Sequence, residues 1–306
     1  MFNKAAVLRG ATSLGPISRT AGQARRFQAQ AGCGTLVLVR HGESEWNASK
    51  RFSGWADVGL TERGQAEARA LGTVLQRSFG ASGFCEAHTS RLRRASDTLA
   101  LVLEAFDAAT APPAESGVSR TWRLNERHYG ALTGQSKDEA AAKHGAAQLA
   151  QWRRGYTVKP PPMTQDHPCF DEIFRTGRCV LRYTPSLLRP PLHRCCARRL
   201  TPPPPPLHYR YDDVPEADLP TMESLEMCEA RCGHYFDKHI LPSAASGRTV
   251  LVAAHNNVMR TLANRLEGLG EAALAQLEIP TGGALVYSIA PEGRHVGERE
   301  LIVADL

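Results

Sequence analysis

Two short apolar runs, far apart in the chain, each lead directly into a histidine. Residues 35–39 are apolar and rich in β-branched side chains, and they are followed by Arg40 and His41. Residues 249–254 repeat the pattern and are followed by His255. Such runs predict buried strands of a parallel sheet. Because open α/β sheets bind ligands beyond the carboxyl ends of their strands, both histidines are predicted to lie at one site.

Helical patterns separate the two predicted strands. Thr61 is a candidate cap for a helix, and residues 98–106 show a second helical pattern. The apolar positions that recur at helical spacing after Thr61 are Ala66, Ala70, Leu71, Val74 and Leu75. This alternation predicts an α/β fold: a three-layer sandwich with a mostly parallel central sheet and helices on both faces.

The positive charge of the chain is concentrated in two segments. The 306 residues carry a formal net charge of +6. Residues 1–34 contain five basic side chains and no acid, and residues 173–211 contain eight arginines and no acid, so the remainder carries −7. The basicity therefore belongs to two appendages, and nucleic-acid binding is not indicated. No run of eighteen apolar residues occurs, so a membrane span is not expected either.

The first appendage, residues 1–34, has the composition of a transit peptide. Arginines are spaced among Ala, Ser, Thr and Gly, and the continuous apolar stretch of a secretory signal is missing. We predict a disordered leader, removed between about Arg25 and Gly34, with a mitochondrial destination. A plastid address and an untargeted cytoplasmic extension are the alternatives. The remaining residues, 35–306, are predicted to form a single catalytic domain.

The second appendage interrupts that domain at about residues 174–209. It is rich in Arg, Pro and Leu and ends in five consecutive prolines, which cannot enter a helix or a central strand. A surface loop is predicted. It is either a binding segment for a partner that recognises proline-rich ligands, an inert insertion, or translated sequence of a retained intron.

Residues suited to binding a small anion follow the predicted strands. Arginine pairs with phosphate and carboxylate oxygens through its planar fork, and Gly42 would let the backbone come close to an anion. The candidate cations are Arg40, Arg94, Arg127, Lys137, Arg153 and Arg154, and the neutral candidates are Asn47, Ser53 and Gly54. The eight cysteines show no C-x-x-C pairs, so no metal site is predicted. No G-x-x-x-x-G-K-[ST] loop is present, so an ATP-dependent kinase is not supported.

Four sequence blocks together resemble one family. They are LVRHGESEWN at 38–47, RFSGW at 51–55, TWRLNERHYGALTG at 121–134, and WRR at 152–154 followed by PPPM at 160–163. The first block resembles the histidine phosphatase superfamily, and the set resembles cofactor-dependent phosphoglycerate mutases. The similarity covers residues 35–172 and 211–289, and neither appendage belongs to it.

The resemblance implies a phosphoglycerate mutase-like fold and a specific chemistry. His41 would carry a phosphohistidine primed by 2,3-bisphosphoglycerate, and Glu126 would move the proton of the reacting hydroxyl. Arg40, Arg94 and His255 would surround the phosphoryl group. The implied substrate-binding residues are Asn47, Ser53, Gly54, Arg127, Tyr129, Lys137, Arg153, Arg154 and Asn257. The implied substrates are 3-phosphoglycerate and 2-phosphoglycerate, with no metal required and a homodimer suggested.

The chain departs from the family pattern at the second histidine. The family has His-Gly-Asn-Ser, whereas this chain has His255, Asn256, Asn257 and Val258. Asparagine tolerates positive φ better than most residues, so the turn is expected to survive there, but its side chain takes up space beside the phosphoryl site. We therefore expect reduced activity.

Three functions fit the sequence. The first is a phosphoglycerate mutase of glycolysis and gluconeogenesis. The second is a phosphatase or a bisphosphoglycerate-handling enzyme of the same superfamily, which would release inorganic phosphate without isomerisation. The third is a catalytically weak scaffold that binds a partner through the Arg/Pro-rich segment. The retained histidines, Arg40, Arg94 and Glu126 favour an enzyme.

Overall fold

The computed structural model describes residues 17–19, 27, 30–80, 83–107, 110–112, 117–174 and 211–304. Apart from residue 174, the predicted insertion at 174–209 lies outside the described residues. Most of the predicted leader also lies outside them, and its identity as a transit peptide stays a prediction. Within the described part of the chain, no helix is long and apolar enough to cross a membrane.

The core of the molecule is one seven-stranded sheet in the order β1-β7-β6-β2-β5-β3-β4. Its strands are β1 (Ile17–Arg19), β2 (Gly34–Arg40), β3 (Glu86–Thr89), β4 (Val118–Arg120), β5 (Thr249–Ala254), β6 (Gly283–Ile289) and β7 (His295–Val303). β6 runs antiparallel to both of its neighbours, β2 and β7, and the other four pairs are parallel. The predicted, mostly parallel sheet is confirmed.

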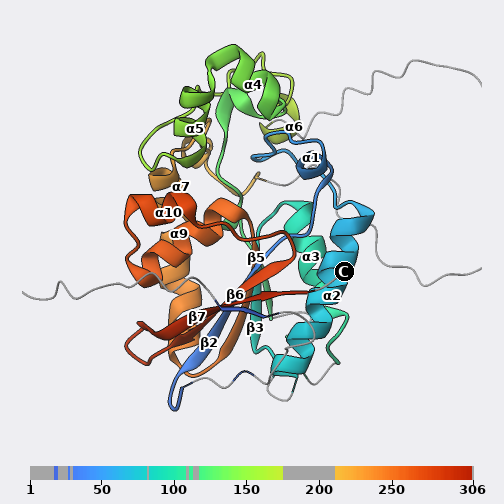
Figure 1. Ribbon diagram of the computed structural model, residues 1–306, viewed down its shortest axis with the longest axis vertical. Coiled ribbons are helices and arrows are strands. Elements are labelled where there is room, and N and C mark those ends of the chain that lie inside the picture. The colour runs from blue at the N-terminus through green and yellow to red at the C-terminus, as the bar shows by residue number, and fades with distance from the viewer. Residues whose placement is uncertain are drawn as a thin grey trace, which may run out of the picture.

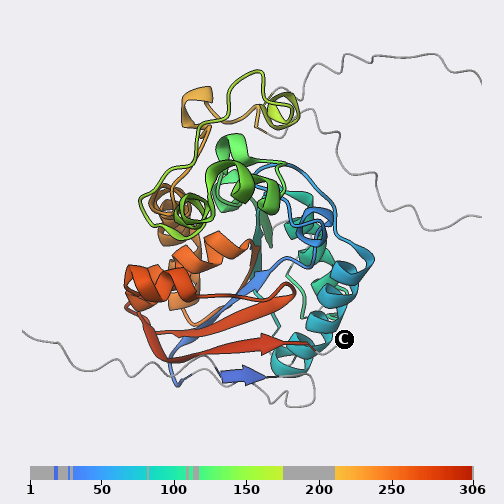
Figure 2. The same cartoon turned by 45° about the horizontal axis from the view of Figure 1, so that its top comes forward.

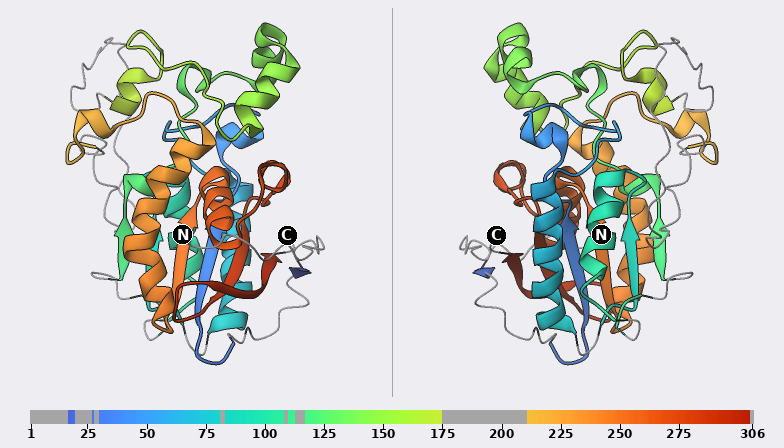
Figure 3. Two further views of the ribbon diagram at one scale, coloured as in Figure 1. Left: turned by 90° about the vertical axis from the view of Figure 1, so that its left-hand side faces the viewer. Right: turned by 90° about the vertical axis from the view of Figure 1, so that its right-hand side faces the viewer.

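Helices cover both faces of this sheet (Figure 3). One face carries α2 (Glu62–Phe79) and α3 (Arg93–Leu103). The other carries α7 (Leu225–Tyr235), the π-helix η6 (Phe236–Ile240), α8 (Leu241–Ala245) and α9 (Asn256–Glu267). The three-layer α/β sandwich expected from the sequence is therefore present.

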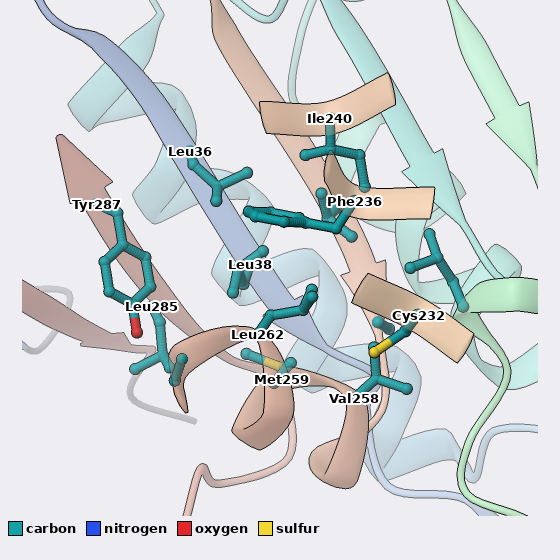
Figure 4. Packing of buried hydrophobic residues seen from close by; sticks show 14 of the residues in the cluster. Leu36, Leu38, Cys232, Phe236, Ile240, Val258, Met259, Leu262, Leu285 and Tyr287 are labelled. Carbon is teal, nitrogen blue, oxygen red and sulfur yellow. The ribbon is translucent and has the colours of Figure 1, made fainter. Parts of the chain in front are cut away.

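Alternate side chains of β2 enter two separate cores. Val37 and Val39 pack in the core beneath α2 and α3, whereas Leu36 and Leu38 pack beneath α7 and α9. Figure 4 shows Leu36 and Leu38 beside Phe236 in this second core. Because all four side chains are at most 1% exposed, each contributes about 1.5–3 kcal/mol of burial free energy, and β2 is fixed from both sides.

The remaining short elements gather beyond one end of the sheet (Figures 1 and 2). They include α1 (Glu45–Ala48), α4 (Lys137–His144), α5 (Ala146–Arg154) and α6 (Phe170–Phe174). The 3₁₀ turns are η2 (Trp122–Leu124), η3 (Gly130–Leu132) and η5 (Glu216–Asp218), and α10 (Glu271–Gln276) precedes β6. They cover the end of the sheet where β2 and β5 deliver their histidines.

Helix α2 begins where the sequence predicts, but its buried face is partly different. Thr61 caps it by accepting a hydrogen bond from the Gly64 amide at 3.0 Å. Leu71, Val74 and Leu75 are buried, as expected. Ala66 is exposed and Ala70 is only half-buried, and Glu67 and Ala68 are buried in their place. The prediction for these two alanines is wrong because the buried face of the helix is centred on Ala68, Leu71 and Leu75 and also includes Glu67, which accepts a hydrogen bond from the Glu43 amide.

Two other boundaries differ from the sequence predictions. Helix α3 starts at Arg93, five residues before the helical pattern predicted from residue 98, and ends at Leu103. The predicted disorder of residues 1–34 does not hold for Ile17–Arg19, which pair in parallel with β7 at the edge of the sheet. The Arg93 amide at the start of α3 donates to Asp57, and Ile17–Arg19 pair with β7, so both features involve segments distant in the chain, which a local pattern does not contain.

The loop after β2 packs directly on the first turn of α2, backbone against backbone. A Cβ added to Gly42 would lie 2.1 Å from the Gly64 carbonyl oxygen, and one added to Gly64 would lie 2.0 Å from the Glu43 carbonyl oxygen. Gly42 was expected to admit an anion. The space beside it is instead filled by α2, so the glycine is required for packing.

We therefore expect Gly64→Ala to lower the free energy of unfolding by about 2 kcal/mol or more, because the backbones must separate. Urea unfolding would measure this. Gly233→Ala is the matched control, since it also lies inside a helix but its Cβ meets only the flexible end of Arg265, at 3.2 Å. That variant should change stability by less than about 1 kcal/mol. Equal effects of the two substitutions would contradict the packing argument.

Candidate active site

The two histidines predicted to share a site lie side by side. β2 and β5 pair in parallel with Arg40 opposite Ala254, so each strand ends at the same level. The His41 amide donates to the Ala254 carbonyl at 3.0 Å, and the two imidazole ring centres are 5.1 Å apart. Both rings are almost fully buried. Main-chain pairing of the strands thus places the two side chains.

The surroundings of His41 favour a neutral imidazole with a defined tautomer. Its Nδ1 lies 2.7 Å from the Gly42 carbonyl oxygen, which can only accept, so Nδ1 carries the proton and Nε2 carries the lone pair. Burial, together with the positive charges of Arg94 and Arg40, lowers the pKa of His41 well below its usual value. An unprotonated Nε2 is the form that attacks phosphorus.

His255 is oriented by a serine that the sequence analysis did not identify. Ser90 Oγ lies 2.8 Å from His255 Nε2 and also accepts a hydrogen bond from the Leu92 amide at 3.2 Å. The contact fixes the orientation of the imidazole ring, and it is compatible with either tautomer of His255. The buried Nδ1 of His255 makes no hydrogen bond to any described residue. Ser90 is distant from His255 in sequence, and no local motif marks the contact.

A strongly cationic cavity of about 160 Å³ opens beside His41. It is lined by Arg40, His41, Asn47, Arg51, Phe52, Ser53, Gly54, Arg94, Glu126, Tyr129, Lys137, Arg153, Arg154, Asn256, Asn257, Arg260 and Glu278. Seven of these residues are Arg or Lys and two are Glu. The balance of charge suits a small ligand with several negative charges.

Two positions in the wall are ready to donate to such a ligand. Arg40 Nε and Ser53 Oγ are buried and make no hydrogen bond to a described residue. Buried polar groups normally have hydrogen-bond partners, so these two donors indicate where the oxygens of a ligand would accept hydrogen bonds. Arg94 is held in place by the backbone, because its guanidinium donates to the carbonyls of Gly54 at 2.8 Å and Ala56 at 2.9 Å.

Of the fourteen site residues predicted from the sequence, all but two line this cavity. His255 does not line it and instead lies against His41. Arg127 was expected to bind substrate, but it is fully buried behind the wall, with its guanidinium 4.7 Å from the centre of the Tyr129 ring. That the lining residues bind substrate stays a prediction.

Five lining residues were not among the predicted site residues: Arg51, Phe52, Asn256, Arg260 and Glu278. Arg260 follows His255 on α9 and donates to Asn257 Oδ1 at 3.1 Å, so helical spacing from Asn257 could have indicated it. Burial lowers its pKa to about 10. No local signal marks Glu278, which meets Arg154 across 124 positions of sequence.

Asn256, the departure from the family pattern, lies in the wall as the first residue of α9. Asn256 does not adopt positive φ. Among the residues that the structure describes, Lys50 is the one non-glycine residue that does. The backbone therefore accepts asparagine without strain, and any effect of Asn256 must come from its side chain.

Glu126 reaches the cavity with one carboxylate oxygen already committed. Asn257 Nδ2 donates to Oε1 at 3.0 Å, and the Arg127 amide donates to the same atom at 2.8 Å. No described residue donates to Oε2, which leaves this oxygen available to exchange a proton with a ligand. Asn257 also donates to the Tyr129 hydroxyl at 2.9 Å, so one amide aligns both cavity residues.

The backbone of this loop is held by a buried ion pair that the sequence did not reveal. Arg231 on α7 donates to both carboxylate oxygens of Glu223, at 2.7 and 2.8 Å. Its remaining donors reach four main-chain carbonyls, of residues 122, 123, 125 and 126. Glu223 in turn accepts from the His128 amide at 2.8 Å. Trp55 Nε1 also donates to the Glu126 carbonyl, at 2.7 Å, so the loop is held from two sides.

Removal of the Arg231 side chain should be costly, because the buried carboxylate of Glu223 loses its counter-cation and four main-chain carbonyls each lose a donor. We expect Arg231→Met to lower the free energy of unfolding by about 3–5 kcal/mol in urea titrations. Arg265→Met is the control, since its ion pair with Asp237 is about 40% exposed on both sides and should contribute less than about 1 kcal/mol. Similar losses of unfolding free energy in both variants would show that burial does not determine how much such an ion pair contributes to stability.

Stability should fall as the pH is lowered from 7.5 to 5.5. Burial lowers the pKa of His41, of His255 and of His128, the last to about 3. Below about pH 6.5 the unfolded chain therefore takes up protons that the folded chain does not, so the free energy of unfolding decreases by up to about 1.4 kcal/mol per pH unit for each such histidine. Urea unfolding at several pH values measures the slope, and His128→Asn should reduce it. A flat profile would mean that these histidines are protonated in the folded state.

These features define a class: a three-layer α/β protein with paired histidines at the carboxyl ends of adjacent parallel strands and a cationic cavity beside them. The model of the histidine phosphatase superfamily (branch 1) matches residues 36–175 and 203–300. The chain belongs to the histidine phosphatase superfamily. This part of the sequence interpretation is confirmed, and small phosphorylated substrates are the expected ligands of such a site.

Solved structures with the same fold include enzymes of two kinds. A mycobacterial glucosyl-3-phosphoglycerate phosphatase is 20% identical over 89% of this chain and 98% of its own, with a TM-score of 0.56. A putative α-ribazole-5′-P phosphatase from Escherichia coli is 18% identical over 86% and 94%, with a TM-score of 0.54. A phosphoglycerate mutase from Bacillus anthracis is 20% identical over 87% and 92%, with a TM-score of 0.53. At such identities the likeness establishes the fold, and it does not separate mutase from phosphatase.

Proposed function

We propose that the chain is a phosphoglycerate mutase that interconverts 3-phosphoglycerate and 2-phosphoglycerate through a phosphohistidine on His41. The observation that carries the proposal is the distribution of cations in the cavity. Arg40 and Arg94 line the cavity together with His41. Three further cations come from the helices beyond the end of the sheet: Lys137 from α4, and Arg153 and Arg154 from α5. Hydrolysis of one phosphate needs only the first group. A ligand with a phosphate and a second anionic group would use both.

The residues support transfer in either direction. As the phosphorus–nitrogen bond at His41 Nε2 breaks, the phosphoryl group bonds to a substrate hydroxyl oxygen, and the hydroxyl proton passes to Glu126 Oε2. In the reverse transfer Glu126 returns the proton to the departing oxygen while Nε2 takes the phosphoryl group. Arg40 and Arg94 stabilise the charge on the phosphoryl oxygens during both steps.

The unpaired buried donors Arg40 Nε and Ser53 Oγ fit a phosphorylated primer as well as a substrate. 2,3-Bisphosphoglycerate would be held by the same cavity cations, and when bound it would supply the first phosphoryl group to His41. No metal ion is part of the proposal. The mitochondrial address and the homodimer stay predictions from the sequence.

A phosphatase of the same superfamily is the second candidate. Two of the three structures compared above carry phosphatase names, and the same histidine chemistry serves both reactions. The two functions differ only in whether a substrate hydroxyl or water accepts the phosphoryl group from His41.

The test is interconversion of 3-phosphoglycerate and 2-phosphoglycerate by the full chain, with and without 2,3-bisphosphoglycerate, with released phosphate measured in the same reaction. We expect primer-dependent isomerisation with little phosphate release. His41→Gln should lower turnover about a thousand-fold or more, because it removes the nucleophile. His234→Gln, an exposed histidine on α7, is the control and should leave turnover unchanged. Phosphate release without isomerisation would replace the mutase by the phosphatase.

A further inference from the structure

Arg154, one of the cations expected to bind substrate, already has partners at both ends of its guanidinium. Nη1 donates to the Ala275 carbonyl at 3.2 Å, and Nη2 contacts the carboxylate of Glu278. Both Arg154 and Glu278 line the cavity. A ligand anion can therefore bind Arg154 fully only after it has replaced the Glu278 carboxylate.

Glu278 is presented by a well-fixed segment of backbone between α10 and β6. Arg40 Nη1 donates to the Ile279 carbonyl at 2.5 Å, and Arg260 Nε donates to the Leu274 carbonyl at 3.0 Å. With the contact of Arg154 to Ala275, cavity arginines hold the main chain on both sides of position 278. Only the side chain of Glu278, which is 59% exposed, is left free to swing away.

The charge of Glu278 is maintained near neutral pH. Partial burial raises its pKa, but the hydrogen bond and charge of Arg154, with further contributions from Arg40 and Arg260, outweigh burial and lower the pKa overall. The only other carboxylate in the wall, among the residues that the structure describes, is Glu126, which Asn257 holds in place. Glu278 is therefore an anion placed among cations in the absence of ligand.

We propose that Glu278 is a specificity-determining residue, an internal counter-anion that a ligand displaces from Arg154 only if it carries a second anionic group besides the phosphoryl group at His41. Inorganic phosphate, seated beside His41 alone, leaves the Glu278–Arg154 pair intact. A ligand with phosphate and carboxylate ends competes with Glu278 and gains Arg154 in return. The proposal rests on the proposed function for the identity of the natural ligand, but its mechanism applies equally to a phosphatase.

The experiment compares two probes by isothermal titration calorimetry on the full chain at low ionic strength. Inorganic phosphate is the single-anion probe. 3-Phosphonopropionate is the two-anion probe, since it carries a phosphonate and a carboxylate but has no hydroxyl and no transferable phosphoryl group. Its binding is therefore independent of whether the chain is a mutase.

Glu278→Gln should bind 3-phosphonopropionate about three- to ten-fold more tightly than the natural chain, because a competing like charge is removed. Its affinity for inorganic phosphate should rise clearly less than its affinity for 3-phosphonopropionate, since phosphate beside His41 does not have to displace the Glu278 carboxylate from Arg154. Glu298→Gln, which removes an exposed acid from β7, is the charge-matched control and should change neither affinity.

A second pair of variants tests whether Glu278 acts through Arg154. In an Arg154→Gln background, Glu278→Gln should give no gain in affinity for 3-phosphonopropionate. Equal gains for both probes, a gain that persists without Arg154, or no gain at all would each overturn the proposal. If the two-anion probe binds as expected while isomerisation is absent, the role of Glu278 stands and the mutase function fails.

Discussion

The parallel pairing of β2 with β5 is the constraint on which the site depends. Main-chain hydrogen bonds fix Arg40 opposite Ala254, and the next residue on each strand is a histidine. A shift of one residue would move every side chain of the strand to the opposite face, so the two cores above and below β2 also fix the level of His41. The geometry of the candidate site is therefore a consequence of sheet register and core packing.

The second constraint is electrostatic. The cavity gathers seven cationic side chains beside His41, and burial lowers the pKa of both His41 and the adjacent His255. Mutual repulsion of the cations is reduced by backbone carbonyls, by Glu126 and by Glu278, and a multiply charged anion would reduce it further. Outside the cavity, the opposite charges of Glu223 and Arg231 neutralise each other in a buried ion pair. Arg231 also donates to the Glu126 carbonyl and so holds the loop of Glu126.

Much of the fold and of the site could be predicted because the relevant signals are local. Apolar runs marked β2 and β5, Thr61 marked the start of α2, and the motif blocks contained nine of the twelve predicted residues that line the cavity. The failures have a common origin in contacts between distant segments. Glu67 is buried against Glu43 whereas Ala66 is exposed, and Gly42 serves the packing of α2 and not the approach of an anion.

The sequence by itself determined β2, β5, two helical segments between them, the histidines at the two strand ends and the family, because periodicity and motifs are properties of neighbouring residues. Only the tertiary structure decided which side chains act together. Ser90 meets His255, Arg231 reaches the carbonyl of Glu126, and Glu278 occupies Arg154. Each of these pairs is separated by more than one hundred positions in the chain. Their contacts follow from the packing of layers in space, which no local spacing of residues encodes.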